Sequence, residues 1–591
     1  MLREAIYHKP WGAFAYLLNS ENLSLTLRAK KSDLKSCKVI YGDPWEPEVP
    51  FNESEMSKVA VSDLFDFFRI VIKVPSHRRF RYAFLLDDGS EQLWYTEIGF
   101  SSKKPESKEL GIPFFEFTYI RENDAFLTPD WAKRAIFYQI FPDRFYNGDK
   151  ANDPSNVVEW GKLPVTHETF YGGDLKGIIE KLSYLINLGI NAIYLTPIFE
   201  SPTTHKYDIT DYYKIDPHFG DLSTLRQLVQ KYHENGVKVI LDGVFDHCGY
   251  EFWAFQDVVK NESKSKYKEW FRIYSFPIKT QPTPSYETWG KDVWRLPRFR
   301  TSNPEVKKYL MDVAVYWIKE VDIDGWRLDT AAEIDHEFWR DFRKTVKAVK
   351  PDALLIGEVS HDASPWLDGD QLDSIMNYPF RDIVIDFFAK DSIGAEEFDA
   401  RLANLRVQYR QQVNEVLYNL LGSHDTVRFL SLCGNNIERM MCALIFQMTY
   451  VGTPVIYYGD EIGMTSAISW DDNRKAMVWN DAEQNRKLLD FHKKLVNIRK
   501  TNPTLANGDF ITLHADSKTN TYAYLRSCEN ERIVAALNNS PRTQDIALQN
   551  EKIGFAPDSV LSDVLNDEKH KIGDGRLQLL LEPYSGAILS E

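Results

Sequence analysis

Four apolar stretches of this chain each end on acidic or histidine side chains. They are Val239 to His247 (VILDGVFDH), Asp324 to Thr330 (DGWRLDT), Leu354 to His361 (LLIGEVSH) and Leu420 to Asp425 (LLGSHD). In a parallel barrel all strands end on the same face, so groups delivered there converge. The pattern therefore indicates a (β/α)8 barrel with acids at its carboxyl end. Any one acid alone is equally explained as a salt-bridged residue at a strand end.

Two of these acids have neighbours that suit opposite protonation states. Arg327 and Asp329 lie two residues apart, so on a strand both side chains leave the same face. A guanidinium there lowers the pKa of Asp329 and keeps it ionised, as a carboxylate nucleophile requires. Glu358 follows Leu-Leu-Ile-Gly, and apolar neighbours favour the protonated form that a general acid needs. Asp425, beside His424, is a third carboxylate suited to hold sugar hydroxyls.

Taken in order, DGVFDH, GWRLDTAAE, GEVSH and LLGSHD resemble the four motif regions of the alpha-amylase family of glycoside hydrolases. The closest resemblance is to the branch of cyclomaltodextrinases, neopullulanases and maltogenic amylases. It implies that Asp329 is the nucleophile, Glu358 the acid/base and Asp425 the third acid. It further implies substrate-binding roles for a set of side chains: Tyr207, His247, Arg327, His424 and Arg428.

The motifs also depart from the usual pattern of that branch. Asp246 stands where the branch usually has Asn, and DTAAE replaces DVANE, which introduces Thr330 and Ala332. Ser360 replaces a tryptophan next to the acid/base. Losing an indole removes an apolar wall on the leaving-group side, so we hypothesise altered handling of acceptor sugars or of α-1,6 linkages.

Amphipathic segments followed by buried strands recur along the middle of the chain, which predicts a parallel sheet with helices outside it. The predicted strands are Ala135 to Phe141, Asn191 to Pro197, Val237 to Phe245, Gly325 to Asp329, Leu354 to Glu358, Ser374 to Asn377, Val416 to Leu421 and Pro454 to Tyr458. Eight strands close a barrel. An aromatic-rich excursion, 249–303, separates the third and fourth strands and is too long for an ordinary loop.

Alternating short strands flank this barrel on both sides. We predict an N-terminal β-sandwich over 1–125, a catalytic barrel over 126–505 that includes the inserted subdomain 249–303, and a C-terminal antiparallel β domain over 506–591. The resemblance implies that the first domain is starch-binding-like and commonly packs against the barrel of a second subunit. A homodimer formed through the N-terminal domain is therefore expected.

A loop rich in oxygen donors follows the first barrel strand. Calcium takes six to eight oxygen ligands, and clustered Asn and Asp side chains supply them. A solvated Asx turn explains the same composition. The resemblance favours a structural calcium, with ligand positions matching Asn147, Asp149, Asn152, Asp153, Gly172 and Asp174.

Charge and composition restrict the partners. The net charge of −15 argues against nucleic acid or an anionic membrane as partner. The chain shows no signal peptide, no membrane-spanning run, no dinucleotide-binding glycine motif and no P-loop. Its five scattered cysteines fit a reducing compartment, so a cytoplasmic location is expected.

The function expected from these observations is retaining hydrolysis of α-1,4-glucosidic bonds, and also of α-1,6 bonds, in cyclodextrins, maltooligosaccharides or pullulan. A covalent glycosyl-aspartate intermediate and some transglycosylation go with that mechanism. One alternative is an oligo-α-1,6-glucosidase or glucosyltransferase on the same barrel. Another is a carbohydrate-binding protein without catalytic activity.

Overall fold

The computed structural model describes most of the chain in two compact units. The described residues are 1–46, 49–75, 78–105, 114–117, 119–121, 124–467, 471–529 and 531–591. The first unit comprises Met1–Thr128, Ile393–Asn414 and Ile511–Asn520. The second comprises Pro129–Ser392, Glu415–Phe510 and Thr521–Glu591.

The first unit is built on two antiparallel sheets. One runs in the order β1 (Ala15–Asn19), β2 (Asn22–Lys30), β6 (Phe65–Lys73), β5 (Ser57–Val61). The other runs β4 (Asn52–Glu55), β3 (Ser36–Gly42), β7 (Phe80–Asp87), β8 (Gln92–Thr96), β9 (Gly99–Ser101), with β10 (Phe115–Phe117) also paired to β7. The predicted N-terminal β-sandwich is confirmed.

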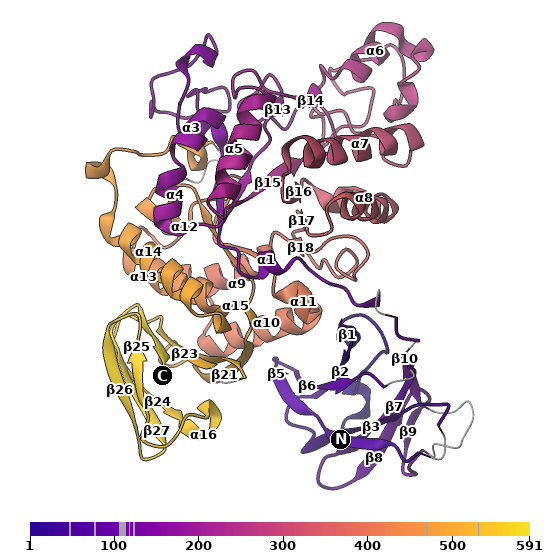
Figure 1. Cartoon of the computed structure of the whole chain (residues 1–591), viewed down its shortest axis with the longest axis vertical. Coiled ribbons are helices and arrows are strands. Elements are labelled where there is room, and N and C mark those ends of the chain that lie inside the picture. The colour runs from indigo at the N-terminus through magenta and orange to yellow at the C-terminus, as the bar shows by residue number, and fades with distance from the viewer. Residues whose placement is uncertain are drawn as a thin grey trace. The chain divides into compact units, whose positions relative to one another are not determined.

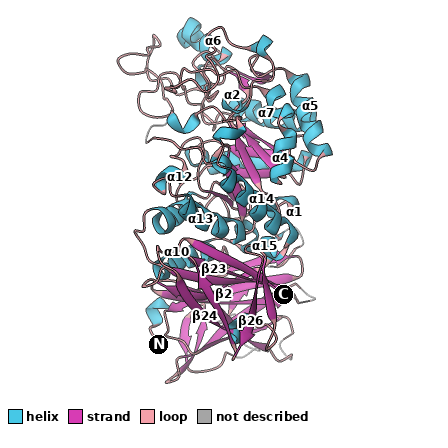
Figure 2. Ribbon diagram, turned by 90° about the vertical axis from the view of Figure 1, so that its left-hand side faces the viewer, coloured by secondary structure: helices cyan, strands magenta, loops and turns pink. Residues whose placement is uncertain are grey.

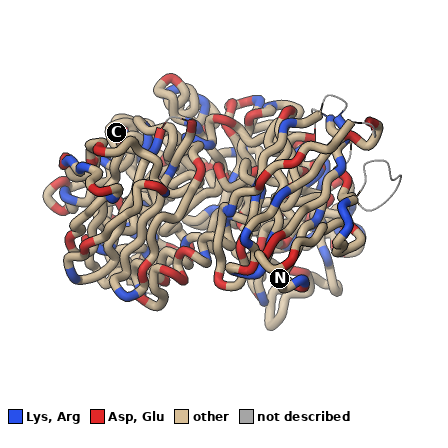
Figure 3. Tube along the Cα trace, turned by 90° about the horizontal axis from the view of Figure 1, so that it is seen from below, with Lys and Arg blue, Asp and Glu red and all other residues tan. Residues whose placement is uncertain are grey.

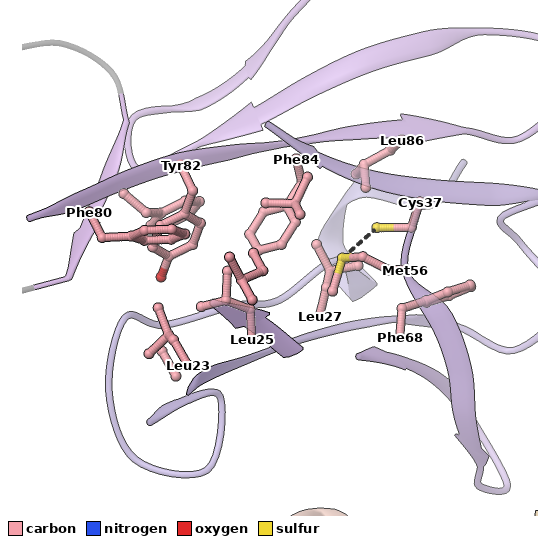
Figure 4. Close-up of a cluster of buried hydrophobic side chains, with 14 of the residues drawn as sticks. Leu23, Leu25, Leu27, Cys37, Met56, Phe68, Phe80, Tyr82, Phe84 and Leu86 are labelled. Atoms are coloured by element: carbon pink, nitrogen blue, oxygen red, sulfur yellow. Dashed lines mark hydrogen bonds between the residues drawn. The ribbon is translucent and has the colours of Figure 1, made fainter. Parts of the chain in front are cut away.

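Alternating apolar residues from both sheets fill the space between them (Figure 4). The central side chains are Leu23, Leu25 and Leu27 of β2 and Phe80, Tyr82 and Phe84 of β7. The unit also contains β21 (Asp509–Asp516), α11 (Gln411–Asn414) and α10 (Ala395–Gln408). Helix α10 contributes Ala403 to a second apolar cluster with Ala60 and Phe67.

The second unit contains the barrel, and all eight predicted strands are present in it. They are β11 (Phe137–Ile140), β12 (Ala192–Leu195), β15 (Lys238–Gly243), β16 (Gly325–Leu328), β17 (Leu354–Gly357), β18 (Ser374–Ile375), β19 (Tyr418–Leu420) and β20 (Thr453–Tyr457). Their order is β18-β17-β16-β15-β12-β11-β20-β19, and all neighbours are parallel. A parallel bridge between Met376 and Tyr418 joins the two ends of this order and closes the barrel.

Helices surround these strands (Figures 1 and 2). The longer ones are α3 (Leu175–Glu180), α4 (Leu182–Leu188), α5 (Leu222–Glu234), α7 (Pro304–Val321), α8 (His336–Val349), α9 (Tyr378–Val384), α13 (Ile437–Thr449) and α14 (Arg486–Thr501). Except at α4, the N-cap side chain of each of these helices accepts a backbone hydrogen bond. The Asn303 side chain accepts from the backbone N–H of Glu305 at the start of α7, with Pro304 at the first helical position.

Close packing between strands explains one glycine of the second motif region. Gly325 begins β16 at φ 155°, and a Cβ there would lie 2.1 Å from the carbonyl oxygen of Leu354 on β17. Any side chain would therefore push apart the two strands that end on Asp329 and Glu358.

The predicted excursion is an inserted subdomain between β15 and α7, and it contains α6 (Trp253–Asn261). Shorter elements complete the barrel region: β13 (Phe199–Glu200), β14 (Asp211–Ile215), α1 (Asp130–Lys133), α2 (Pro142–Phe145), α12 (Phe429–Leu432) and α15 (Thr504–Asn507).

The chain ends in the predicted antiparallel sheet, whose strands in the second unit follow the order β22 (Thr521–Cys528), β23 (Glu531–Asn538), β28 (Ser585–Ser590), β25 (Val560–Asp563), β26 (Glu568–Gly573), β27 (Arg576–Leu581), β24 (Gln544–Gln549). The short helix α16 (Asn550–Ile553) follows β24. Acidic and basic residues are both scattered along the trace in Figure 3. Among the described helices, none has both the length and the apolar character needed to cross a bilayer.

Candidate active site

A cavity of about 380 Å³ lies at the carboxyl end of the barrel strands and contains the three predicted acids. Its lining residues are His205, Tyr207, His247, Trp289, Val293, Leu296, Asp329, Thr330, Glu358, Asp425 and Arg474. Asp329 follows the last residue of β16, and Glu358 follows the last residue of β17. The backbone N–H of Glu358 donates to the carbonyl of Leu328, which extends the strand register and places the two acids side by side.

The guanidinium of Arg327 contacts three carboxylates at once. Its Nη1 donates to Asp329 Oδ1 at 2.7 Å and lies 3.1 Å from Asp242 Oδ2. Its Nη2 forms an ion pair with Glu358 Oε2 at 2.8 Å. Arg327 is 1% exposed, so these charges interact with little screening by solvent. One buried cation therefore holds both candidate catalytic acids on the same side of the cavity.

The protonation of Asp329 differs from the sequence expectation. Burial raises the pKa of Asp329 well above its usual value; Arg327 opposes this shift, and Glu358 and Asp242 add to it. The pKa of Asp242 is raised as well, again chiefly by burial. The net shift of the Asp329 pKa is opposite to the expected one, because burial outweighs the lowering by Arg327, whose guanidinium is also shared among three carboxylates. This cluster therefore retains a proton more readily than free carboxylates do.

Asp425 differs from these acids in its surroundings. Burial raises its pKa, but His424 and Arg474 lower it by more, so the net shift is downward. Nη2 of Arg474 lies 2.9 Å from Asp425 Oδ1, and Nε2 of His424 lies 3.0 Å from Asp425 Oδ2. Asp425 is therefore more readily ionised than Asp329.

His424 also orients Tyr207. Their rings stack at 5.6 Å with an interplanar angle of 7°, and the Tyr207 hydroxyl lies 2.7 Å from His424 Nε2. The side-chain amide of Gln139 donates to His424 Nδ1 at 2.7 Å, which assigns the ring proton to Nε2. The Tyr207 hydroxyl donates in turn to Asp242 at 3.0 Å. A single network therefore fixes an aromatic platform and the third acid.

Thr330 carries backbone strain beside the nucleophile. It adopts φ 41° and ψ 44°, a conformation that β-branched residues rarely adopt. Its N–H donates to Glu358 Oε2 at 3.0 Å. The strained turn at Thr330 thus supplies a hydrogen bond to Glu358, the candidate acid/base. Backbone strain of this kind is often found at functional sites.

The remaining predicted residues divide into two groups. His247 lines the cavity, and its Nε2 is buried without a protein partner. Arg428 is fully buried, donates to Asp460 Oδ1 at 2.7 Å and to the carbonyl of Tyr458, and is not among the lining residues. The structure therefore gives Arg428 a structural contact instead of the predicted contact with substrate. Ser360 is exposed, and among the described residues it does not line this cavity either.

Several lining residues were not predicted from the sequence. Arg474 lies in the loop after β20, and its partner Asp425 is far away in sequence. Trp289, Val293 and Leu296 come from the inserted subdomain, and the Trp289 ring lies 5.7 Å from that of His247. The sequence indicated a long aromatic-rich insertion over 249–303, but only the fold selects which of its side chains reach the cavity.

The loop predicted to bind calcium brings several oxygens together. Asn147 Nδ2 donates to Asp153 Oδ1 at 2.7 Å, while the Oδ1 atoms of Asn147 and Asn152 are buried without a hydrogen-bond partner. Gly172 has φ 77°, and a Cβ there would lie 2.2 Å from Asp153 Oδ1. Two unsatisfied amide oxygens beside a carboxylate fit a hard cation.

The other two predicted ligands are engaged elsewhere. Asp174 caps α3 and accepts from the backbone N–H groups of Gly148, Asp149 and Gly177. The Asp149 side chain forms an ion pair with Lys176 at 3.3 Å. Among the described residues no cluster of three His, Cys, Asp or Glu could hold a metal ion. A cation here would therefore need amide and backbone oxygens in addition to carboxylates.

Comparison with known proteins agrees with the geometry. Residues 139–485 match the family model "Alpha amylase, catalytic domain", and residues 1–121 match "Alpha amylase, N-terminal ig-like domain". The chain belongs to the alpha-amylase family of glycoside hydrolases, in the branch of cyclomaltodextrinases, neopullulanases and maltogenic amylases.

Individual relatives match over nearly the whole chain. It is 50% identical over 590 residues to a cyclomaltodextrinase of Thermoanaerobacter pseudethanolicus, covering 100% of both chains. It is 46% identical over 592 residues to neopullulanase 2 of Thermoactinomyces vulgaris, covering 100% of this chain and 99% of that one. A solved structure titled cyclomaltodextrinase superposes with a TM-score of 0.94 at 39% identity, with full coverage of both chains.

Proposed function

We propose that this protein hydrolyses α-1,4-glucosidic bonds, and also α-1,6 bonds, in cyclodextrins, maltooligosaccharides or pullulan, with retention of anomeric configuration. The main support is the contact of one guanidinium, that of Arg327, with both Asp329 and Glu358 at the wall of a single cavity. Relatives named cyclomaltodextrinase and neopullulanase support the substrate class.

In the proposed reaction a carboxylate oxygen of Asp329 attacks the anomeric carbon while the bond to the leaving oxygen breaks. Glu358 gives its proton to that oxygen, so the acceptor part of the substrate departs as an alcohol. Water then attacks the glycosyl-aspartate ester, Glu358 takes its proton, and Asp329 is released as a carboxylate. A second sugar hydroxyl in place of water gives transglycosylation.

The proposed reaction needs the two acids in opposite protonation states. Three carboxylates surround one guanidinium, and the cluster retains a proton because its aspartates are buried. The reaction requires that proton on Glu358, which opens to the cavity, and an ionised Asp329 that keeps the hydrogen bond from Arg327. Asp425, ionised beside His424 and Arg474, is placed to bind sugar hydroxyls and to favour the distorted ring of the transition state.

Two measurements test this proposal. Hydrolysis of a chromogenic maltoside should fall at least about 1,000-fold in Asp329→Asn, since that variant removes the nucleophile. Proton NMR during early turnover should show α-anomeric product. Retention requires that the two carboxyl groups lie roughly 5 to 5.5 Å apart, so an inverted first product would contradict the mechanism.

A product analysis on β-cyclodextrin, pullulan, soluble starch and isomaltooligosaccharides separates the alternatives. An oligo-α-1,6-glucosidase or glucosyltransferase would release its main products from isomaltooligosaccharides, not from β-cyclodextrin, pullulan or starch. A carbohydrate-binding protein without activity would bind these glucans and yield no product from any of them.

We further propose a structural calcium at the site formed by Asn147, Asp149, Asn152, Asp153, Gly172 and Asp174. The two unsatisfied amide oxygens are the supporting observation. A bound cation would satisfy them and hold the loop that carries them; it takes no part in bond cleavage.

We also propose that the chain forms a homodimer through its N-terminal domain and resides in the cytoplasm. Trp45 is 71% exposed on that unit, with the Arg79 guanidinium 5.1 Å from its ring, and an exposed aromatic–arginine pair is common in protein interfaces. All five cysteines are free, which supports a reducing compartment. Light scattering should give twice the chain mass of 68.7 kDa.

A further inference from the structure

The inserted subdomain returns to the barrel alongside the residues that follow β15. The backbone N–H of Phe299 donates to the carbonyl of Asp246 at 2.9 Å, and that of Cys248 donates to the carbonyl of Pro297 at 3.0 Å. A bridge between His247 and Arg298 lies between these two hydrogen bonds. The pairing sets Arg298 beside Asp246.

Asp246 is held from one side by Arg298. Its carboxylate is 2% exposed, and Oδ1 accepts from Nε and Nη2 of Arg298 at 3.1 and 2.7 Å. Arg298 is fixed in turn by Glu287 Oε1 at 3.3 Å and by the Glu333 carbonyl at 2.8 Å. The carboxylate therefore has a defined orientation.

The other carboxylate oxygen faces His247, with Oδ2 3.3 Å from Nδ1 of the imidazole. An ionised carboxylate only accepts hydrogen bonds, so the neutral imidazole must carry its proton on Nδ1. Nε2 then presents a lone pair. That atom is buried, has no protein partner, and belongs to a side chain that lines the cavity.

We propose that Asp246, oriented by Arg298, is a positioning residue that fixes His247 as a hydrogen-bond acceptor for a hydroxyl group of the bound sugar. An asparagine at this position would not specify the tautomer, because its amide both donates and accepts. The lone pair on His247 Nε2 would favour sugars that have a free hydroxyl group facing this atom. This inference rests on the proposed hydrolase function, since it assumes that a sugar occupies the cavity.

A double-mutant cycle tests the proposal on the full-length protein with a chromogenic maltoside. Asp246→Asn is expected to raise KM about tenfold with little change in kcat, since it weakens one hydrogen bond to bound sugar. In a His247→Ala background the same change should alter KM less than about twofold, because its effect acts through the imidazole. Equal losses in both backgrounds would overturn the proposal, as would a KM unchanged by Asp246→Asn.

Two further variants exclude a merely structural effect. Arg298→Lys keeps the positive charge but loses the paired contact with Oδ1 of Asp246. It should therefore raise KM less than Asp246→Asn does. This increase, too, should appear only when His247 is present. Arg300→Lys, which alters an exposed ion pair with Glu269 on the same returning segment, should leave KM unchanged. Should Asp246→Asn fail to fold, the cycle of Arg298→Lys with His247→Ala decides by the same criterion. Absence of hydrolysis by the native protein would instead refute the proposed function.

Discussion

Tyr207→Phe is the substitution that tests the polar network around the cavity most directly. The Tyr207 hydroxyl donates to Asp242 at 3.0 Å and lies 2.7 Å from His424 Nε2. Phenylalanine keeps the ring that stacks on His424 and removes only this hydroxyl. Asp242 keeps its other tyrosine donor, Tyr194, and its contact with Arg327, so the site should remain assembled.

The expected magnitude follows from the two contacts that are lost. A hydrogen bond to a charged group is worth about 1.5–3 kcal/mol, and about 1.4 kcal/mol corresponds to a tenfold change. If the network serves the transition state, kcat/KM for a chromogenic maltoside should fall about 10- to 100-fold. The free energy of unfolding should fall by only about 1 to 2 kcal/mol, since the carboxylate keeps other partners.

Tyr184→Phe is a matched control. Tyr184 donates to the buried carboxyl of Glu461 at 2.6 Å, and that carboxyl also keeps a second tyrosine donor, Tyr138 at 2.9 Å. Tyr184 does not line the cavity. Its variant should lose similar stability by calorimetry and keep kcat/KM within twofold. The reasoning is refuted if both variants lose activity equally, or if Tyr207→Phe stays within twofold of the native protein.

Three further predictions concern other parts of the chain. Ser360→Trp should shift the product profile on pullulan and maltotriose if the missing indole sets acceptor handling, and identical profiles would exclude that role. Chelation of calcium should lower the melting temperature of the native protein by several degrees. The variant Asn152→Ala should melt at a lower temperature than the native protein in added calcium, and chelator should not change its melting temperature further. If neither chelator nor the substitution changes the melting temperature, the calcium proposal is wrong. Burial raises the pKa of Glu461 to about 7, so the folded state binds this proton more tightly than the unfolded chain. The contribution of Glu461 to the free energy of unfolding should fall as pH rises from about 4.5 to about 7. Glu461→Gln should remove this part of the pH dependence of stability. The same pH dependence in the variant would contradict the raised pKa of Glu461.

The site shows where reasoning from sequence stops. Arg327 and Asp329 were paired correctly from their spacing, because residues two apart on a strand share a face. The spacing could not reveal that the same guanidinium also contacts Asp242 and Glu358 from neighbouring strands. That sharing, together with burial, reversed the expected direction of the pKa shift of Asp329.

Sequence by itself determined that the chain forms a barrel, which segments become its eight strands, and which acids stand at the strand ends. These features follow from the periodicity of helices and strands, which is a local property of the chain. Tertiary structure alone decided which side chains meet in the cavity. Arg474 reaches Asp425 across 49 residues, and Arg298 reaches Asp246 across 52. Those pairs depend on how the loop after β20 and the inserted subdomain fold back over the barrel, and no local pattern encodes contacts between segments so far apart.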